Sequence, residues 1–181
     1  MSTDQEIVHE VDLPEGVTAS IAGRVITVKG PLGTVKKDFD RINVFVEVKG
    51  GKVHVKPFSE KKKDVVSSNT ASSLIRNIIT GVTKGYTFKL KVVYAHFPVT
   101  VKVKGRTVAV ENFVGERSAR ETDILGDCKV SVEGDDIIIK GVSLEDVGQT
   151  AANLEQATKI KRKDQRIFLD GVYVDETMKG W

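Results

Sequence analysis

Residues Val17–Gly33 read VTASIAGRVITVKGPLG, and residues Val99–Gly115 read VTVKVKGRTVAVENFVG. At a constant offset of 82 (17 to 99, 33 to 115) the two stretches share six identities. Each has a Gly-Arg step between two runs of alternating apolar residues, where a tight hairpin needs positive φ. The pattern predicts one small domain written twice. The identities are Val17/Val99, Thr18/Thr100, Gly23/Gly105, Arg24/Arg106, Val28/Val110 and Gly33/Gly115.

Short β-like runs follow in both halves. Lys52–Lys56 reads KVHVK and Asp136–Lys140 reads DIIIK, each after a turn signal at Gly50-Gly51 or Gly134-Asp135. A helical pattern comes after each run. The agreement therefore extends well beyond the first hairpin.

Two helices are predicted from apolar residues at helical spacing. The first covers Val66–Val82 with Gly85 as its stop, and the second covers Val147–Ile160. Ser143 with Asp146 three residues later resembles a capping box, with Asp in place of Glu. The two helices align at an offset of 80, through Thr70-Ala71 and Leu74 in the first and Thr150-Ala151 and Leu154 in the second.

Each half is thus predicted to read as strands, one long helix and a closing strand. The closing strand is Tyr86–Phe97 in the first half and Gly171–Val174 in the second. The predicted fold class is α+β: a tandem duplication of a small domain with a mostly antiparallel or mixed β-sheet packed on one helix. We expect the first repeat over residues 1–83 and the second, with a basic C-terminal segment, over residues 84–181.

Composition indicates a soluble globular protein. The 181 residues are 40% hydrophobic and 29% charged, and their net charge is only +3. No apolar run approaches the ~20 residues that span a bilayer, and the polar, acidic residues 1–10 do not read as a signal or transit peptide. Cys128 is the single cysteine, which excludes internal disulfides and predicts a small residue in or near the core. These features predict an intracellular protein.

Residues that carry catalysis or bind metals form no recognisable set. The histidines His9, His54 and His96 are scattered, without metal-ligand spacing, and His54 is expected to be an exposed strand residue. Residues 30–33 (GPLG) match the GXXG loop of KH domains, but that loop joins two helices, whereas this segment joins two predicted strands. It is interpreted as a turn. We expect no enzyme, no cofactor, no metal and no small-molecule substrate.

Basic side chains concentrate after the second predicted helix. Residues 159–166 read KIKRKDQR, five basic residues against the single acid Asp164, a local charge of +4. Two interpretations stay open: a solvated helix end whose cations favour the helix dipole, and a set of phosphate contacts. Lys61-Lys62-Lys63, at the start of the first helix, is either a solvated loop or an RNA contact. The five basic residues are Lys159, Lys161, Arg162, Lys163 and Arg166.

The segment Tyr86–Lys104 alternates lysines with apolar residues, and its aromatic residues could supply stacking surfaces. Phe97 is expected in the core. The candidate RNA-binding residues of this region are Lys89, Lys91, Tyr94, His96, Lys102 and Arg106.

Five short motifs in order resemble the universal family of large-subunit ribosomal proteins called six in bacteria and nine in eukaryotes. The resemblance covers about residues 11–174, and the YAHFP and KRKDQRIFLDG segments look like its archaeal and eukaryotic branch. The short chain suggests the archaeal type. The motifs are VKGPLG at 28–33, GVTKGY at 81–86, YAHFP at 94–98, ENFVGE at 111–116 and FLDGVYV at 168–174.

The resemblance implies a structural constituent of the large ribosomal subunit, located in the cytoplasm on the ribosome. Implied partners are large-subunit rRNA near the stalk base and sarcin–ricin loop, neighbouring ribosomal proteins, and translational GTPases nearby. It also implies that the second domain anchors the RNA through a basic loop that corresponds to residues 159–166. The bacterial form of that loop is Pro/Gly-rich, so its detailed RNA contacts do not transfer.

The alternative is an intracellular tandem protein-interaction module with incidental RNA binding. Residues 1–82 hold 12 basic and 10 acidic side chains, a net charge of +2 (12 − 10) over a whole domain. This near balance favours protein contacts for the first half.

Overall fold

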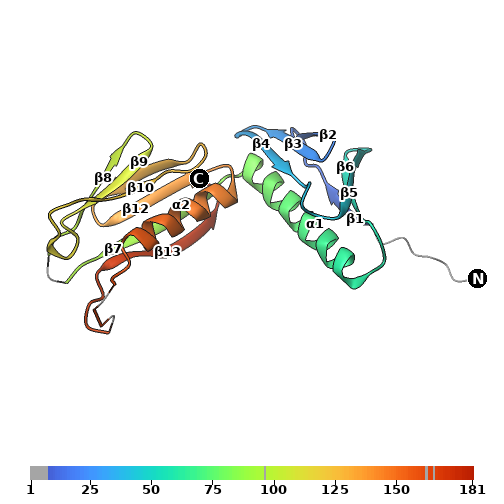
Figure 1. Cartoon of the computed structure of the whole chain (residues 1–181). Coiled ribbons are helices and arrows are strands. Elements are labelled where there is room, and N and C mark those ends of the chain that lie inside the picture. Colours follow the sequence, from blue (N-terminus) through green and yellow to red (C-terminus); the bar gives the residue numbers. More distant parts are fainter. Residues whose placement is uncertain (1–7, 96, 162, 165) are drawn as a thin grey trace, which may run out of the picture. The chain divides into compact units, whose positions relative to one another are not determined.

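The computed structural model describes residues 8–95, 97–161, 163–164 and 166–181. Contacts within the chain divide it into two compact units, Met1–Lys84 and Gly85–Trp181, drawn in Figure 1. The boundary lies one residue after the predicted one.

The first unit contains two three-stranded antiparallel sheets, with strand orders β1-β6-β5 and β2-β3-β4. Helix α1 packs on both sheets, and Val53, Val55 and Ile75 are completely buried between the layers. The elements are β1 (His9–Asp12), β2 (Thr18–Ala22), β3 (Val25–Gly30), β4 (Gly33–Asp38), β5 (Val44–Lys49), β6 (Lys52–Pro57) and α1 (Lys62–Thr83).

The second unit repeats this plan and adds a strand. A four-stranded antiparallel sheet has the order β11-β12-β7-β13, and a three-stranded sheet has the order β10-β9-β8. Its helix α2 covers a core that includes Leu90, Ile137 and Ile139. The elements are β7 (Tyr86–Val93), β8 (Thr100–Lys104), β9 (Thr107–Glu111), η1 (Phe113–Gly115), β10 (Arg120–Asp123), β11 (Lys129–Glu133), β12 (Asp136–Gly141), α2 (Leu144–Ala157) and β13 (Gly171–Lys179).

The fold is therefore the predicted tandem duplication of an α+β domain, with one difference in strand assignment. The predicted closing strand of the first half, Tyr86–Phe97, is wrong: β7 ends at Val93 and pairs with β12 and β13 of the second unit. Its counterpart in the first unit is β1, because Asp12 pairs with Lys52 as Lys91 pairs with Asp136. The other predicted closing strand extends to Lys179 instead of Val174.

The paired Gly-Arg steps form equivalent β-hairpins, as predicted. The glycine before each arginine has a φ of 64° or 61°. Arg24 donates through Nη1 to the carbonyl oxygen of Asp40 at 2.8 Å, and Arg106 donates through Nη2 to that of Gly126 at the same distance. The arginine thus occupies the same position in both copies, where it braces a later loop of its own unit.

The GPLG segment is a turn between β3 and β4, as predicted. Gly30 pairs with Gly33 across it, and Leu32 N donates to Val82 O at 3.1 Å. A Cβ on Gly30 would lie 2.8 Å from Val82 Cβ and from its carbonyl oxygen. Glycine is needed at position 30 because the strand meets the end of α1 too closely for a side chain.

Both helices form as predicted, but their alignment differs by one residue. Ser143 Oγ accepts a hydrogen bond from Asp146 N at 3.3 Å, which confirms the N-cap. The offset of 80 is wrong because Thr70 is exposed, whereas Thr150 is buried. An offset of 79 superimposes the buried faces, through Ser68/Val147, Ala71/Thr150, Ser72/Ala151, Ile75/Leu154 and Ile79/Thr158.

Cys128 lies near the core of the second unit, as predicted. It packs against the buried cluster, and a Cβ on Gly141 would lie 3.0 Å from its Sγ. Burial, with a smaller contribution from Asp146, raises the pKa of the thiol to about 11. The thiol therefore stays protonated and unreactive at neutral pH.

Candidate nucleic-acid interface

The segment between α2 and β13 forms a loop that projects from the second unit (Figure 1). Its two ends are fixed by buried polar groups. Thr158 Oγ1 donates to Leu154 O at 3.1 Å and accepts from Val172 N at 3.0 Å, which ties the helix end to the start of β13. At the far end, Asp170 Oδ1 accepts from Ala95 N at 2.6 Å.

Within the loop, one acidic residue organises the turn. Asp164 Oδ1 accepts from Arg166 N at 2.9 Å, and its carbonyl oxygen accepts from Ile167 N and Phe168 N at 3.1 and 3.0 Å. The Nζ of Lys163 lies 4.5 Å from the centre of the Phe168 ring. Asp164, the single acid of the basic stretch, thus accepts hydrogen bonds from the backbone of the turn.

The cations of the loop point to solvent. Lys159, Lys161, Lys163 and Arg166 are exposed, and across the residues with assigned structure none of them lies within 4.0 Å of a carboxylate oxygen. Exposed like charges this close repel one another. An anionic partner would remove that repulsion. Arg162, predicted with them, lies outside the described residues.

Arg120 occupies the end of α2, the place that one of the two interpretations gives to the loop cations. Its Nη1 donates to Ala157 O at 2.9 Å and to Lys159 O at 3.2 Å, where the helix leaves carbonyl groups unsatisfied. The guanidinium also forms two hydrogen bonds with Glu116 and lies 4.4 Å above the centre of the Phe113 ring. These contacts favour the interpretation of the loop cations as partner-binding groups.

The Arg120–Glu116 pair also has an electrostatic signature. The hydrogen bonds from Arg120 hold the pKa of the Glu116 carboxyl below its usual value, and the pKa of Arg120 is raised in turn. No local pattern in the sequence indicates this role, because Arg120 stands 37 positions before the first carbonyl it binds.

Several candidates from the first strands of this unit already have partners in the chain. Lys89 pairs with Asp136 at 3.0 Å and Lys102 with Glu111 at 2.6 Å. These contacts raise the pKa of Lys89 and lower that of Glu111. Arg106 likewise donates a hydrogen bond to Gly126 O. Lys89, Lys102 and Arg106 therefore use some of their hydrogen-bond donors within the chain.

Two other candidates of this region, Lys91 and Tyr94, lie beside residues that adjoin the loop. Lys91 is exposed and pairs in register with Tyr173, the third residue of β13 after the loop. Tyr94, 41% exposed, directly precedes the residue that Asp170 binds. His96 lies outside the described residues. Phe97 was expected in the core, but this is wrong: it is 46% exposed because the strand has ended at Val93.

The other basic cluster, Lys61-Lys62-Lys63, begins α1. Lys61 is the N-cap residue and gives no side-chain cap. Asp64 lies in the first turn and accepts a hydrogen bond from Ser59 Oγ. Its carboxylate supplies the local compensation that positive charge at a helix N-terminus requires.

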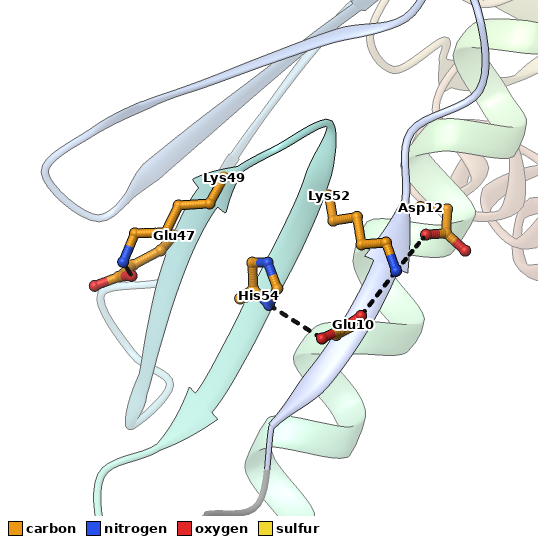
Figure 2. A network of polar contacts seen from close by, with 6 residues as sticks. All are labelled: Glu10, Asp12, Glu47, Lys49, Lys52 and His54. Carbon is orange, nitrogen blue, oxygen red and sulfur yellow. Dashed lines mark hydrogen bonds and ion pairs between the residues drawn. The ribbon is translucent and has the colours of Figure 1, made fainter.

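In the first unit, the outer face of the β1-β6-β5 sheet carries a mixed set of charges (Figure 2). Lys52 Nζ lies 2.9 Å from Glu10 Oε2 and 3.3 Å from Asp12 Oδ1, and Lys49 pairs with Glu47. The hydrogen bonds lower the pKa of Glu10 and Glu47 and raise that of both lysines. This surface, which we call the paired face, carries cations that are already neutralised.

His54 completes the paired face. It lies opposite Glu10 on one neighbouring strand and Glu47 on the other, and its Nδ1 is 3.7 Å from Glu10 Oε1. Predicted as an exposed strand residue, it lies on the outer face with 22% of its side chain exposed. In the part of the chain that the structure describes, no three metal-ligating side chains gather at one place.

Comparison with known proteins identifies the family. The family model for ribosomal protein L6 matches residues 13–85 and again residues 97–171, which is most of both units. The chain belongs to the ribosomal protein L6 family. Family membership makes it a structural, non-enzymatic protein of the ribosome, in agreement with the predicted absence of catalysis. No described helix is long and apolar enough to cross a membrane.

The relatives are archaeal, as the resemblance suggested. A protein of Methanosarcina mazei named large ribosomal subunit protein uL6 is 46% identical over 170 residues, covering 94% of this chain and 97% of the relative. The protein of that name in Archaeoglobus fulgidus is 47% identical over 179 residues, 95% and 91% of the two chains. The one in Methanocella arvoryzae is 44% identical, covering 93% and 96%.

Proposed function

We propose that this chain is a structural component of the large ribosomal subunit and that it holds large-subunit rRNA through the loop after α2. The observation that carries the proposal is the set of exposed cations at Lys159, Lys161, Lys163 and Arg166, which have no ion pair among the described residues. The names of its archaeal relatives support the subunit assignment.

The mechanism is electrostatic and depends on a fixed scaffold. Ammonium and guanidinium groups neutralise phosphates and release counterions from the RNA. The loop that carries them is fixed at both ends by Thr158 and Asp170 and is braced by Arg120. The protein thereby holds a particular RNA shape and needs no chemistry of its own.

We place the chain near the stalk base and the sarcin–ricin loop, close to where translational GTPases dock. Support for this location comes from the sequence resemblance set out above. The remaining candidates Lys89, Lys91, Tyr94, His96, Lys102, Arg106 and Arg162 stay predictions of RNA contact. The repeats over residues 1–83 and 84–181 are proposed as the units of the duplication.

Two experiments test the proposal. In sucrose gradients of a cell lysate, the chain should migrate with the large subunit even at high salt. The double variant Lys161→Ala/Lys163→Ala should bind large-subunit rRNA transcripts more weakly and with a flatter salt dependence. The control Lys36→Ala/Lys129→Ala removes two exposed lysines elsewhere. Equal affinity and equal slope for both double variants would contradict the loop assignment.

The first unit is proposed to contact neighbouring ribosomal proteins. Its paired face is neutralised, and beside it Phe45 and Phe58 are 57% and 39% exposed with ring centres 4.2 Å apart. Exposed aromatic groups are typical of protein interfaces. The variant Phe45→Ser should lower recovery with the large subunit and leave affinity for the rRNA transcripts unchanged. A loss of transcript affinity would instead assign this surface to RNA.

A further inference from the structure

Beside the basic loop, the second unit contains a cavity of about 350 Å³. It is bounded by the last turn of α2, the two ends of the loop and the first residues of β13. Its volume lies in the range of about 300–1,000 Å³ that holds small organic ligands. None of the phosphate contacts proposed above requires it.

One wall of the cavity is an aromatic ring held in a fixed position. Tyr173 donates its hydroxyl to Leu169 O at 3.1 Å, and its ring lies over Gly171. A Cβ on Gly171 would be 3.0 Å from two ring carbons and from the hydroxyl oxygen of Tyr173, so the missing side chain lets the ring fold back. The ring is still 44% exposed. A preorganised, half-exposed ring is a surface on which a planar group can stack at low entropic cost.

The remaining walls combine apolar groups with acceptors. Ile160, Phe168 and Val172 supply apolar surface, whereas Glu155 and Gln156 supply polar side chains from the last turns of α2. The carboxylate of Glu155 repels a phosphate but accepts hydrogen bonds from ring N–H and amino groups. The walls therefore suit an uncharged, planar, hydrogen-bonding group.

The rim has the opposite electrostatic character. Lys159 lines the cavity, and Lys161 and Lys163 follow it in the loop, all exposed. Lys91, the register partner of Tyr173, lies on the same face of the sheet and is exposed. Cations at the rim with acceptors and apolar groups inside match one nucleotide of an RNA strand, whose phosphates are charged and whose base is flat.

From this arrangement we infer that the cavity takes up one unpaired base of the bound rRNA, which stacks on Tyr173 while its flanking phosphates contact the rim lysines. Single-stranded bases splayed from a loop or bulge are the parts of RNA that proteins recognise by stacking and hydrogen bonding. The inference rests on the proposed function and adds a site of base recognition to its phosphate contacts.

The test uses the full-length chain and in vitro transcripts of archaeal large-subunit rRNA. Tyr173→Leu should weaken binding about tenfold, the scale of one lost base–aromatic stack, with no change in salt dependence, because no phosphate contact is lost. Tyr173→Phe keeps the ring and should bind nearly as tightly as the unaltered chain. Val66→Ala, which alters an exposed apolar side chain of the first unit, is the control and should have no effect.

A second variant protects the test against misfolding. Gln156 is exposed on α2, so Gln156→Ala should leave the fold intact and weaken binding about threefold if the base is hydrogen-bonded there. Ultraviolet crosslinking of the complex, read by mass spectrometry, should place RNA on the peptide that contains Phe168 and Tyr173.

Two failures are distinguishable. Salt-dependent binding that is weakened by Lys161→Ala/Lys163→Ala, but not by Tyr173→Leu or Gln156→Ala, would overturn the base site and leave the phosphate contacts standing. Absence of salt-dependent rRNA binding by the unaltered chain would overturn the proposed function together with the base site.

Discussion

The two copies of the domain differ in the surroundings of their lysines. On the paired face of the first unit, Lys49 and Lys52 lie against Glu47, Glu10 and Asp12 in the same sheet (Figure 2). In the loop of the second unit, the lysines are exposed and have no carboxylate within 4.0 Å among the residues described. The number of lysines alone does not distinguish a surface suited to RNA from a structural surface. The two surfaces differ in whether carboxylates lie close to the lysines.

The same scaffold produces both outcomes. β1-β6-β5 and β7-β12-β11 share their pairing, and the positions of Glu10 and Asp12 on β1 correspond to Lys89 and Lys91 on β7. Two acids of the first unit therefore correspond to two lysines of the second unit at equivalent strand positions. The second unit also has a loop between its helix and an extra strand, β13, and this loop carries the cationic segment.

The largest effect is expected from a change at Arg120, the residue that braces the loop of the second unit. Arg120→Gln removes two hydrogen bonds to Glu116 and the bonds to the carbonyl oxygens of Ala157 and Lys159. It should lower the free energy of unfolding by about 2 kcal/mol, the scale of charge-assisted hydrogen bonds. Urea denaturation measures this, and Arg117→Ala, which alters an exposed arginine nearby, should change stability little. An equal loss of unfolding free energy in the two variants would contradict the bracing role of Arg120.

A smaller effect, on RNA affinity, is expected when the acidic partners of the lysines on the paired face are removed. Glu10→Gln/Glu47→Gln removes two acids and leaves Lys49 and Lys52 without these partners, a change of +2 in net charge. The variant should bind unrelated RNA about threefold more tightly at low salt, with a steeper salt dependence. Filter binding measures both. Unchanged affinity would show that something other than charge pairing keeps RNA off this face.

The smallest effect concerns acid sensitivity. Because Arg120 lowers the pKa of Glu116 in the folded chain, the pair stabilises the fold above the carboxyl's ordinary pKa of 4.5. That contribution is lost as pH falls through the lowered value. Glu116→Gln should therefore cost about 0.5 kcal/mol at neutral pH, since the pair is partly exposed. Below the lowered pKa it should cost nothing, and a cost that persisted there would contradict the pairing.

The sequence predicted those parts of the fold that depend on local constraints. The Gly-Arg hairpins, the Ser143 cap and the GPLG turn each need particular residues within a few positions. The assignment of β7 failed because its partner strand β12 lies more than 40 residues away, and an alternating strand looks the same whether it closes one domain or opens the next. Phe97 was misplaced because no local signal showed that the strand ends before it.

The candidate site likewise has a part that the sequence predicts and a part that only the structure reveals. The density of basic residues at 159–166 is visible in the sequence, and the loop is where they lie. Arg120, Tyr173 and the cavity could not be found there, since they depend on contacts between the end of α2, β10 and the start of β13. Nor does the sequence reveal that Lys89 and Lys102 are paired, because their carboxylate partners come from other strands.

The central claim is that RNA is held by the loop of the second unit and not by the paired face of the first. Lys56 lies on β6 two residues after His54 and therefore on the same face of the sheet. The most direct test compares the salt dependence of rRNA binding for Lys159→Ala/Lys161→Ala/Lys163→Ala and for Lys49→Ala/Lys52→Ala/Lys56→Ala. The two triple variants change the net charge equally. We predict that the loop variant loses about 2 from the slope of log affinity against log salt, whereas the paired-face variant keeps the original slope. Equal slopes, or a greater loss from the paired face, would contradict the account.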